Sequence, residues 1–239
     1  MDLTREAIDR IAELAAPTLE DVAGRPYSSK ALVPVQDPMP VPVHLNSLQA
    51  LADFLKWEFP GGRTQLVAQV VNETFVLIHG RLIFPWQQRP VLAKTEFEEG
   101  TKFPFGQYLD QERFLIGVQV GFVPDEATAR LLKLVGTVED SKVLKLQDDG
   151  VSQQVSASVG LARVELMTVP NPVELCPYRT FAEVLQPSSK YIVRARSGQA
   201  QEPPTFALHL VEDPRWRAQA RAYIADYLKT QVSDLTVLA

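Results

Sequence analysis

An aspartate, a second aspartate and a lysine have the spacing of a metal-dependent nuclease. Pro124-Asp125 is followed by Asp140-Ser141-Lys142, the loose form of the motif in which two carboxylates bind Mg²⁺ and a lysine orients the attacking water. The metal in such a site stabilises charge on phosphate while it activates water. Short patterns of this kind arise often by chance, and Pro124-Asp125 has the composition of a helix start. We favour a helix cap, and keep Asp125, Asp140 and Lys142 as candidate catalytic residues of an alternative, Mg-dependent nuclease.

A second group of residues has the chemistry of an anion site. Its candidate ligand-binding residues are Tyr178, Arg179, Arg194 and Arg196. Arg194 and Arg196 are two residues apart in a β-rich segment, which places them on one strand face. Planar guanidinium groups bind phosphates bidentately, and arginines of the C-terminal helix could contribute as well. The alternative, which we favour, is a set of ion pairs with nearby carboxylates such as that of Glu183.

Other reactive residues predict no further chemistry. Cys176 is the only cysteine, which excludes an intrachain disulfide and a thiolate zinc site within one chain, and we expect it to be a small buried side chain. His209 alternates with Leu208 and Leu210, so it projects from the opposite strand face and is expected to be structural. Phosphate-loop, dinucleotide-binding and nucleophile-elbow motifs are missing from the sequence. We therefore expect no metal and no cofactor, and we favour a binding protein over an enzyme.

Composition narrows the class of partner. The 239 residues carry a net charge of −5, and 46% of them are hydrophobic. Nucleic-acid binding is possible but not favoured by this charge, because phosphate neutralisation needs clustered Lys and Arg. No secretory signal or spanning apolar stretch is visible, so the prediction is a cytoplasmic protein that does not enter a membrane.

Hydrophobic periodicity predicts the elements that position these residues. Helices are expected over residues 4–15, from Asn46 or Ser47 to 59, over 124–135, over a short stretch from Thr180 to Pro187, and from 214 onward. Strands are expected over 64–71, 74–84, 90–97, 143–146, 151–159, 191–196 and 205–211. Residues 114–122 suit either a helix capped by Asp110 or a strand. Their two glycines favour the strand.

These elements predict an α+β fold with an antiparallel β-sheet core and a C-terminal amphipathic helix. We divide the chain into N-terminal helices with an extended arm, residues 1–60, and an α+β core domain, residues 61–239. The arm spans residues 17–45 and holds six prolines, which favour extended backbone and at best an edge strand over 41–45. It either wraps over the protein's own core, which we favour, or docks on a neighbouring subunit.

Several motifs resemble uncharacterised proteins of tailed phages and prophages. They are Pro170-Asn171-Pro172-Val173, Pro177 to Val184, Gln186-Pro187, Tyr191 to Arg194 and Asp148-Asp149-Gly150-Val151-Ser152-Gln153. Such proteins carry a Gly-Gly pair before the closing tryptophan, where this chain has Asp213-Pro214-Arg215. No activity is established for the group, so the resemblance implies a context, the cytoplasm of an infected bacterium, and an accessory role.

The resulting hypothesis is a non-enzymatic phage accessory protein that self-assembles into a homo-oligomer and binds a host or phage component in host takeover, counter-defence or DNA metabolism. Two alternatives stay open: a sponge for a small anionic ligand or nucleotide, and the nuclease.

Overall fold

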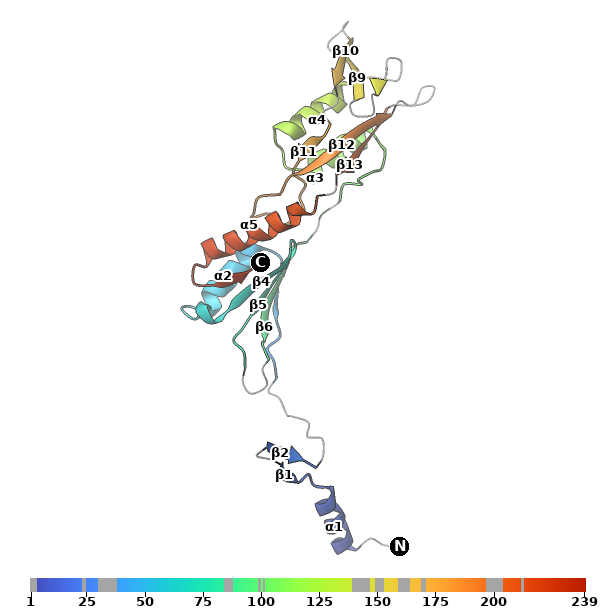
Figure 1. Ribbon diagram of the computed structural model, residues 1–239. Coiled ribbons are helices and arrows are strands. Elements are labelled where there is room, and N and C mark those ends of the chain that lie inside the picture. Colours follow the sequence, from blue (N-terminus) through green and yellow to red (C-terminus); the bar gives the residue numbers. More distant parts are fainter. Residues whose placement is uncertain are drawn as a thin grey trace. The chain divides into compact units, whose positions relative to one another are not determined.

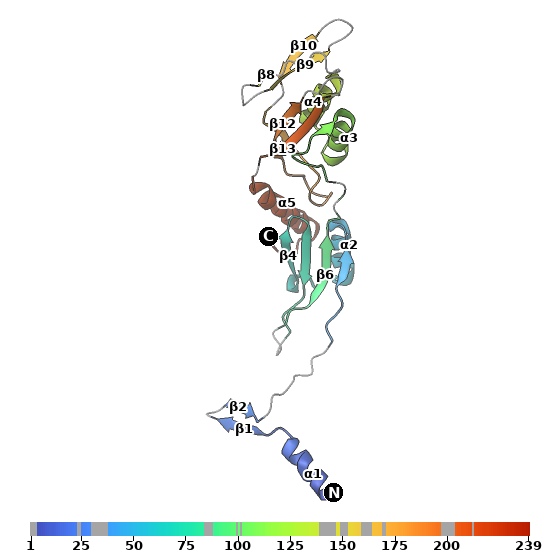
Figure 2. The same ribbon diagram turned by 90° about the vertical axis from the view of Figure 1, so that its right-hand side faces the viewer.

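The fold was examined in a computed structural model of the chain (Figures 1 and 2). The structure describes residues 4–22, 25–29, 38–83, 88–98, 100, 102–138, 147–148, 153–158, 164–168, 171–196, 204–211 and 213–239. These residues form helices and mixed sheets, and the predicted α+β class is confirmed. The chain divides into two compact units, residues 1–39 and 40–239.

The first unit consists of one helix and one hairpin. Helix α1, Arg5–Ala15, begins at the N-cap Thr4, whose Oγ1 accepts a hydrogen bond from the backbone N–H of Ala7. This confirms the predicted helix over residues 4–15. Strands β1, Leu19–Val22, and β2, Arg25–Ser28, pair antiparallel within the segment predicted to be an extended arm.

One hydrophobic core of the second unit lies between two helices and a five-stranded sheet. The strands are β3 (Val43–Leu45), β4 (Val67–Asn72), β5 (Phe75–His79), β6 (Val91–Glu96) and β14 (Thr236–Leu238), in the order β14-β4-β5-β6-β3. The helices are α2 (Leu48–Glu58), which contacts β3 and β6, and α5 (Arg215–Gln231), which contacts β4 and β14. Both helices cover the same face of the sheet (Figure 1). A short 3₁₀ helix, Arg63–Gln65, precedes β4.

Alternating burial explains this core. Ala68, Val70, Val76, Ile78 and Ala93 are buried, while intervening residues of the same strands are partly or fully exposed. The strands predicted over 64–71, 74–84 and 90–97 are confirmed as β4, β5 and β6, and β5 pairs antiparallel with both β4 and β6. The sheet is nevertheless mixed, because β14 and β3 pair parallel with β4 and β6. The segment over 41–45 is an edge strand, as its prolines predicted.

The other core lies under a four-stranded sheet in the order β11-β12-β13-β7. The strands are β7 (Leu109–Asp110), β11 (Val173–Leu175), β12 (Ser189–Arg196) and β13 (Thr205–Leu210). Helices α3 (Gln111–Gly121) and α4 (Glu126–Thr137) pack on it and on each other. A three-stranded sheet of β8 (Gln147–Asp148), β9 (Gln153–Ser158) and β10 (Val164–Thr168) adjoins β12 through β9.

The strand that the sequence favoured over residues 114–122 is wrong, because this segment is helix α3 with Asp110 as its N-cap. Its glycines have a packing role instead of a strand role. A Cβ built on Gly117 would stand 3.0 Å from two ring carbons of Phe103, so only glycine leaves room for that ring. Phe103 packs edge-on against Phe114 and Phe122 at each end of the helix.

The short helix predicted from Thr180 to Pro187 is also wrong. This segment is a loop organised by the Gln186 amide, whose Oε1 accepts from the backbone N–H groups of Arg179 and Thr180. The Gln186 Nε2 donates to the carbonyls of Thr180, Phe181 and Val184. The Thr180 hydroxyl, expected to cap a helix, donates to the carbonyl of Glu73 at 2.5 Å. One side chain thus satisfies backbone groups that a helix would otherwise pair.

Helix α4 confirms the prediction over residues 124–135 with small shifts at its ends. Asp125 is the N-cap, and its Oδ1 accepts from the backbone N–H of Thr128 at 2.7 Å. Pro124 therefore precedes the helix, and Gly136 lies inside its last turn with Val138 as the C-cap. Within the described part of the chain, no helix has both the length and the apolar character needed to cross a bilayer.

Candidate functional site

A cavity of about 610 Å³ lies in the second unit, where residues of both hydrophobic cores meet. Its aromatic lining comes from five segments and consists of Phe97, Phe103, Phe105, Tyr178, Tyr191 and Trp216. Its charged lining consists of Glu73, Lys102, Arg179 and Arg217. The volume falls within the range of small-molecule sites, and an apolar wall with a few polar groups is their usual chemistry.

Arg179 is held in one orientation at this cavity. Its Nη2 donates to the carbonyls of Pro187 and Ser188, at 2.8 and 3.2 Å, and to the Ser189 hydroxyl at 2.8 Å. The guanidinium carbon lies 3.8 Å from the ring centroid of Trp216, in the first turn of α5. A guanidinium fixed by stacking and by three acceptors loses little conformational freedom when it binds an anion.

The Arg179 Nε is buried, and within the described residues it has no hydrogen-bond partner. Burial lowers the pKa of this guanidinium, while Tyr191, Cys176 and Glu73 act in the opposite direction. An arginine stays protonated under such shifts. The guanidinium therefore stays charged in the cavity wall, and its buried Nε, without a partner in the described part of the chain, costs about 1–3 kcal/mol.

Arg217 supplies a second positive charge. Its Nε lies 3.2 Å from Glu73 Oε1, on the turn between β4 and β5, and its guanidinium carbon is 5.2 Å from the Trp216 centroid. Trp216 thus contacts two arginines. The lining carries three basic side chains against one carboxylate, so its electrostatic preference is for an anion.

The apolar wall is rigid on one side. Phe105 stacks on Tyr191 with ring centroids 5.3 Å apart and an interplanar angle of 18°. The loop that carries Phe105 turns at Gly106, whose φ of +77° suits glycine and whose N–H donates to the carbonyl of Leu208. Burial raises the pKa of Tyr191 to about 12, so its phenol stays protonated at neutral pH. Tyr178 is 49% exposed at the rim.

The sequence candidates separate in space. Tyr178 and Arg179 line the cavity, whereas Arg194 and Arg196 are not among its lining residues. The prediction that Arg194 and Arg196 share a strand face is confirmed by the alternating burial of β12. The guanidinium carbon of Arg196 lies 3.7 Å from the Tyr108 ring centroid, and that ring meets His209 edge-on. His209 is thus part of a packed surface cluster on the face opposite Leu208, as its alternation predicted.

The nuclease candidates are only partly visible. Asp125 serves as the helix cap that the sequence favoured, and Asp140 and Lys142 lie outside the described residues. Among the residues that are described, no group of three His, Cys, Asp or Glu side chains is arranged to hold a metal ion. Cys176 is half-buried, and burial raises the pKa of its thiol.

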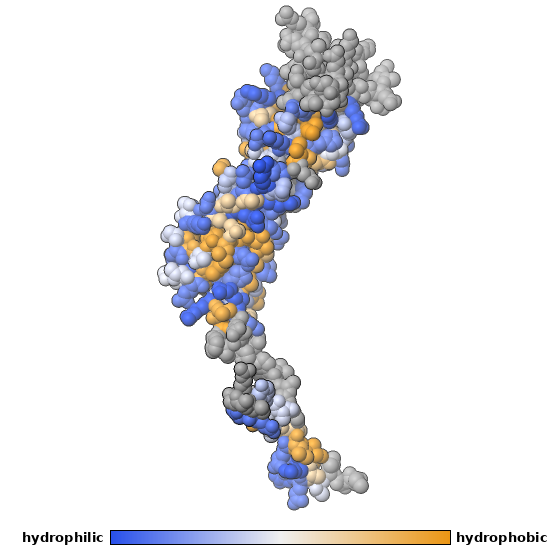
Figure 3. All heavy atoms as spheres, in the orientation of Figure 1, coloured by the Kyte–Doolittle hydropathy of each residue, from blue (hydrophilic) through white to orange (hydrophobic). Residues whose placement is uncertain are grey.

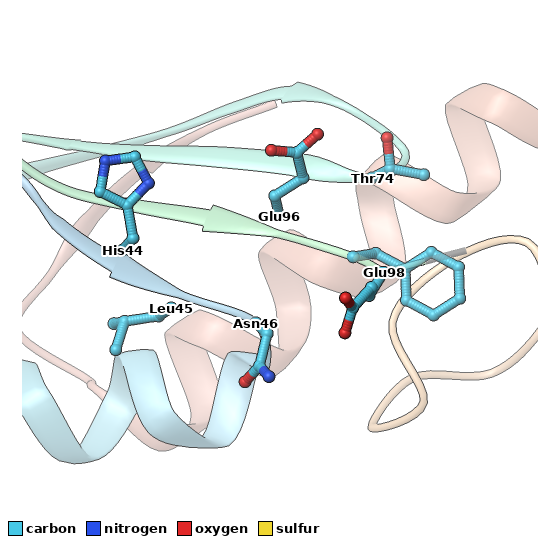
Figure 4. Close-up of a pocket in the computed structure, with 7 residues that line it drawn as sticks. His44, Leu45, Asn46, Thr74, Glu96 and Glu98 are labelled. Carbon is cyan, nitrogen blue, oxygen red and sulfur yellow. The ribbon is translucent and has the colours of Figure 1, made fainter. Parts of the chain in front are cut away.

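A second hollow, of about 810 Å³, is wider and more polar. Side chains from β3, the turn before α2, Thr74 and the end of β6 surround it, as Figure 4 shows for His44, Asn46, Glu96 and Glu98. Its ionisable side chains are those of Glu96, Glu98 and His44, and its aromatic lining is limited to Phe97. It lacks the fixed cationic group that gives the first cavity a defined ligand preference.

Sequence reasoning found Tyr178 and Arg179, and it included Arg217 among the arginines of the C-terminal helix that could contribute, but it missed Trp216 and Glu73 as their partners. These two come from a helix and a turn whose contact with the 177–187 loop depends on tertiary packing. A comparison of the chain with protein-family models, curated proteins and solved structures finds no match. The resemblance to phage proteins therefore stays a prediction, and the cavity is the feature that indicates a function.

Proposed function

We propose that this protein binds a small aromatic or otherwise planar anion in the cavity beside Arg179 and Trp216. The observation that carries the proposal is the Arg179 guanidinium, fixed by three acceptors and by Trp216, in the wall of an aromatic cavity. This is one of the alternatives that the sequence left open. A phage accessory role in a bacterial cytoplasm and a role in counter-defence remain predictions from the resemblance.

The lining specifies the chemistry of the ligand. An anionic group meets Arg179 and Arg217, and an apolar or aromatic body meets the rings of Phe103, Phe105 and Tyr178. Aromatic rings attract flat ligands by offset stacking, while a guanidinium binds carboxylate or phosphate through paired hydrogen bonds. A nucleotide or an aromatic carboxylate has both parts. Inorganic phosphate has only the charge, and a neutral nucleoside has only the ring.

The test is a thermal-unfolding titration of the full chain with AMP, benzoate, inorganic phosphate, adenosine and benzamide. A ligand at about 100 times its Kd adds about 2.7 kcal/mol to the free energy of unfolding. For a chain of this size each kcal/mol raises Tm by about 2–4 °C. We expect an upward shift of about 5–10 °C with at least one aromatic anion and smaller shifts with phosphate, adenosine and benzamide.

Two variants locate the site. Arg179→Gln removes the charge at the cavity and is expected to abolish the shift, while the Tm of the unliganded variant reports any loss of fold. Arg194→Gln is the matched control, since this arginine lies on a strand outside the lining. A shift that survives Arg179→Gln but disappears in Arg194→Gln would move the anion site to β12. Absence of a shift with every probe in the unmodified protein would end the proposal.

A further inference from the structure

Helix α1 presents an apolar face that is exposed along its whole length. No residue of α1 is buried, and Ile8 and Ile11 are 52% and 55% exposed. In Figure 3 hydrophobic atoms of this segment gather on one side and hydrophilic atoms on the other. A helix of 11 residues is only marginally stable in water by itself, and a two-stranded hairpin such as β1–β2 is too. The first unit therefore needs a surface to pack against.

The arrangement of charges on α1 indicates which surface fits. When Ile8 and Ile11 are placed at the a and d positions of a heptad, Ala7, Ala12 and Leu14 fall at the flanking e and g positions. Four of the five charged residues, Glu6, Asp9, Arg10 and Glu13, fall at b, c and f on the opposite side, and the fifth, Arg5, falls at an e position in the first turn. Arg10 pairs there with Glu13 at 2.8 Å within the same helix.

This polar face argues against lipid and nucleic acid as partners. It carries three carboxylates and one arginine, whereas helices that lie on membrane surfaces carry Lys and Arg there. Anionic head groups and phosphates would be repelled by the carboxylates. A protein surface without charge at the contact fits better.

We propose that α1 packs against the α1 helices of other copies of this chain, so that the N-terminal unit holds the protein in a homo-oligomer. From Ala7 to Leu14, identical copies of α1 meet without like-charge contact, because the charged residues of this stretch face outward and its e and g positions are apolar; Arg5 stands at an e position only at the N-terminal end of the helix. Two copies of α1 can thus bring their apolar faces together while their charged faces stay in contact with solvent.

The size of the face sets the number of copies. A standard interface buries roughly 800 Å² on each partner, and one face of a three-turn helix offers less. Because α1 has apolar residues at e and g as well as at a and d, its apolar face is wider than the a/d contact surface of a two-stranded coiled coil. Both points favour a bundle of three or more α1 helices over a dimer.

The experiment compares the full-length protein with two single variants by light scattering after size exclusion over a wide range of concentrations. Ile11→Glu places a charge in the apolar face without lowering intrinsic helix propensity, since glutamate forms helices at least as well as isoleucine. We expect a mass of three or more chains for the unmodified protein and a fall toward the 26.6 kDa monomer for Ile11→Glu. Asp9→Asn, on the charged face, is expected to keep the assembly.

A second readout tests direct contact between helices. Ile8→Cys in a Cys176→Ser background leaves one thiol per chain, and mild oxidation is expected to trap disulfide-linked pairs that the Asp9→Cys counterpart does not form. A monomeric unmodified protein, an assembly that survives Ile11→Glu, or a monomer that sediments with phosphatidylglycerol vesicles would each overturn the proposal.

Discussion

The guanidinium carbon of Arg179 lies 3.8 Å from the ring centroid of Trp216, although 37 positions separate the two residues in the chain. This contact joins the loop of the Pro-Tyr-Arg-Thr-Phe segment, residues 177–181, to the first turn of α5. It also fixes one of the two guanidinium groups that the proposed anion would meet.

Trp216→Ala is expected to weaken anion binding by about 3- to 30-fold, because a cation–π contact contributes about 0.5–2 kcal/mol and its loss frees the guanidinium. Trp216→Phe keeps a ring face and is expected to lose less. Isothermal titration with the best aromatic anion measures both. Trp57→Ala is the matched control, since Trp57 is 78% exposed on α2 and lies outside the cavity lining. Unchanged affinity in Trp216→Ala would remove Trp216 from the site.

Two helical glycines are expected to respond in opposite ways to alanine. Gly136→Ala in α4 meets nothing within 4 Å and gains up to about 1 kcal/mol in helix propensity. Gly117→Ala in α3 gains the same propensity but drives a Cβ to 3.0 Å from the Phe103 ring, for which an overpacking cost of about 1–3 kcal/mol is expected. Urea unfolding should show Gly136→Ala more stable and Gly117→Ala less stable than the parent. Equal gains would mean that the Phe103 ring moves aside at no cost.

The phenol of Tyr191 is expected to make stability fall in alkali. Its folded pKa is about 12 against an ordinary value of 10.0, so the folded state keeps a proton that the unfolded state releases. The contribution is complete below pH 10 and is lost as pH rises from 10 toward 12. Denaturant unfolding across this range should show a steeper decline for the parent than for Tyr191→Phe. Tyr178→Phe, at an exposed position, should follow the parent.

The side-chain amide of Asn171 makes the two hydrogen bonds to Val193 that a neighbouring strand would otherwise make. Its Oδ1 accepts from the Val193 N–H at 2.8 Å, and its Nδ2 donates to the Val193 carbonyl at 3.2 Å. Asn171→Asp replaces the donor with a second acceptor opposite that carbonyl, for a cost of about 1–3 kcal/mol at neutral pH. A protonated aspartate can donate again, and the facing carbonyl raises the pKa of the carboxyl in the folded state, so the deficit should shrink as pH falls toward about 4. A deficit independent of pH would mean that lost packing, not the donor, is responsible.

The sequence was informative where a local pattern and its tertiary role agreed. Thr4 and Asp125 cap helices. Buried and more exposed side chains alternate along β4, β5, β6 and β12. Each of these features can be predicted from residues that are close together in the sequence. Arg179 was a candidate because its planar guanidinium, together with those of Arg194 and Arg196, has the chemistry of phosphate binding.

The failures have a common physical origin in contacts between distant segments. Gly117 looked like a strand residue because the Phe103 ring that requires it is 14 positions away. The Thr180 to Pro187 segment looked like a capped helix because the acceptor of the Thr180 hydroxyl is the Glu73 carbonyl. The parallel pairing of β14 with β4 joins strands more than 160 residues apart, beyond any local signal.

The order of the two cores along the chain has a consequence for synthesis. The core under β11-β12-β13-β7 draws its buried residues from one continuous stretch, Phe103 to Leu208. The core under β14-β4-β5-β6-β3 combines Leu48 to Ala93 with Phe181 and with Ile224 to Leu235. During synthesis the core built from the continuous stretch can fold before the C-terminal residues are made. Strands β3 to β6 are covered only by α2 until α5 and β14 emerge from the ribosome. The five-stranded sheet thus begins to be translated first but is completed last, and until β14 is made β4 is an unpaired edge strand.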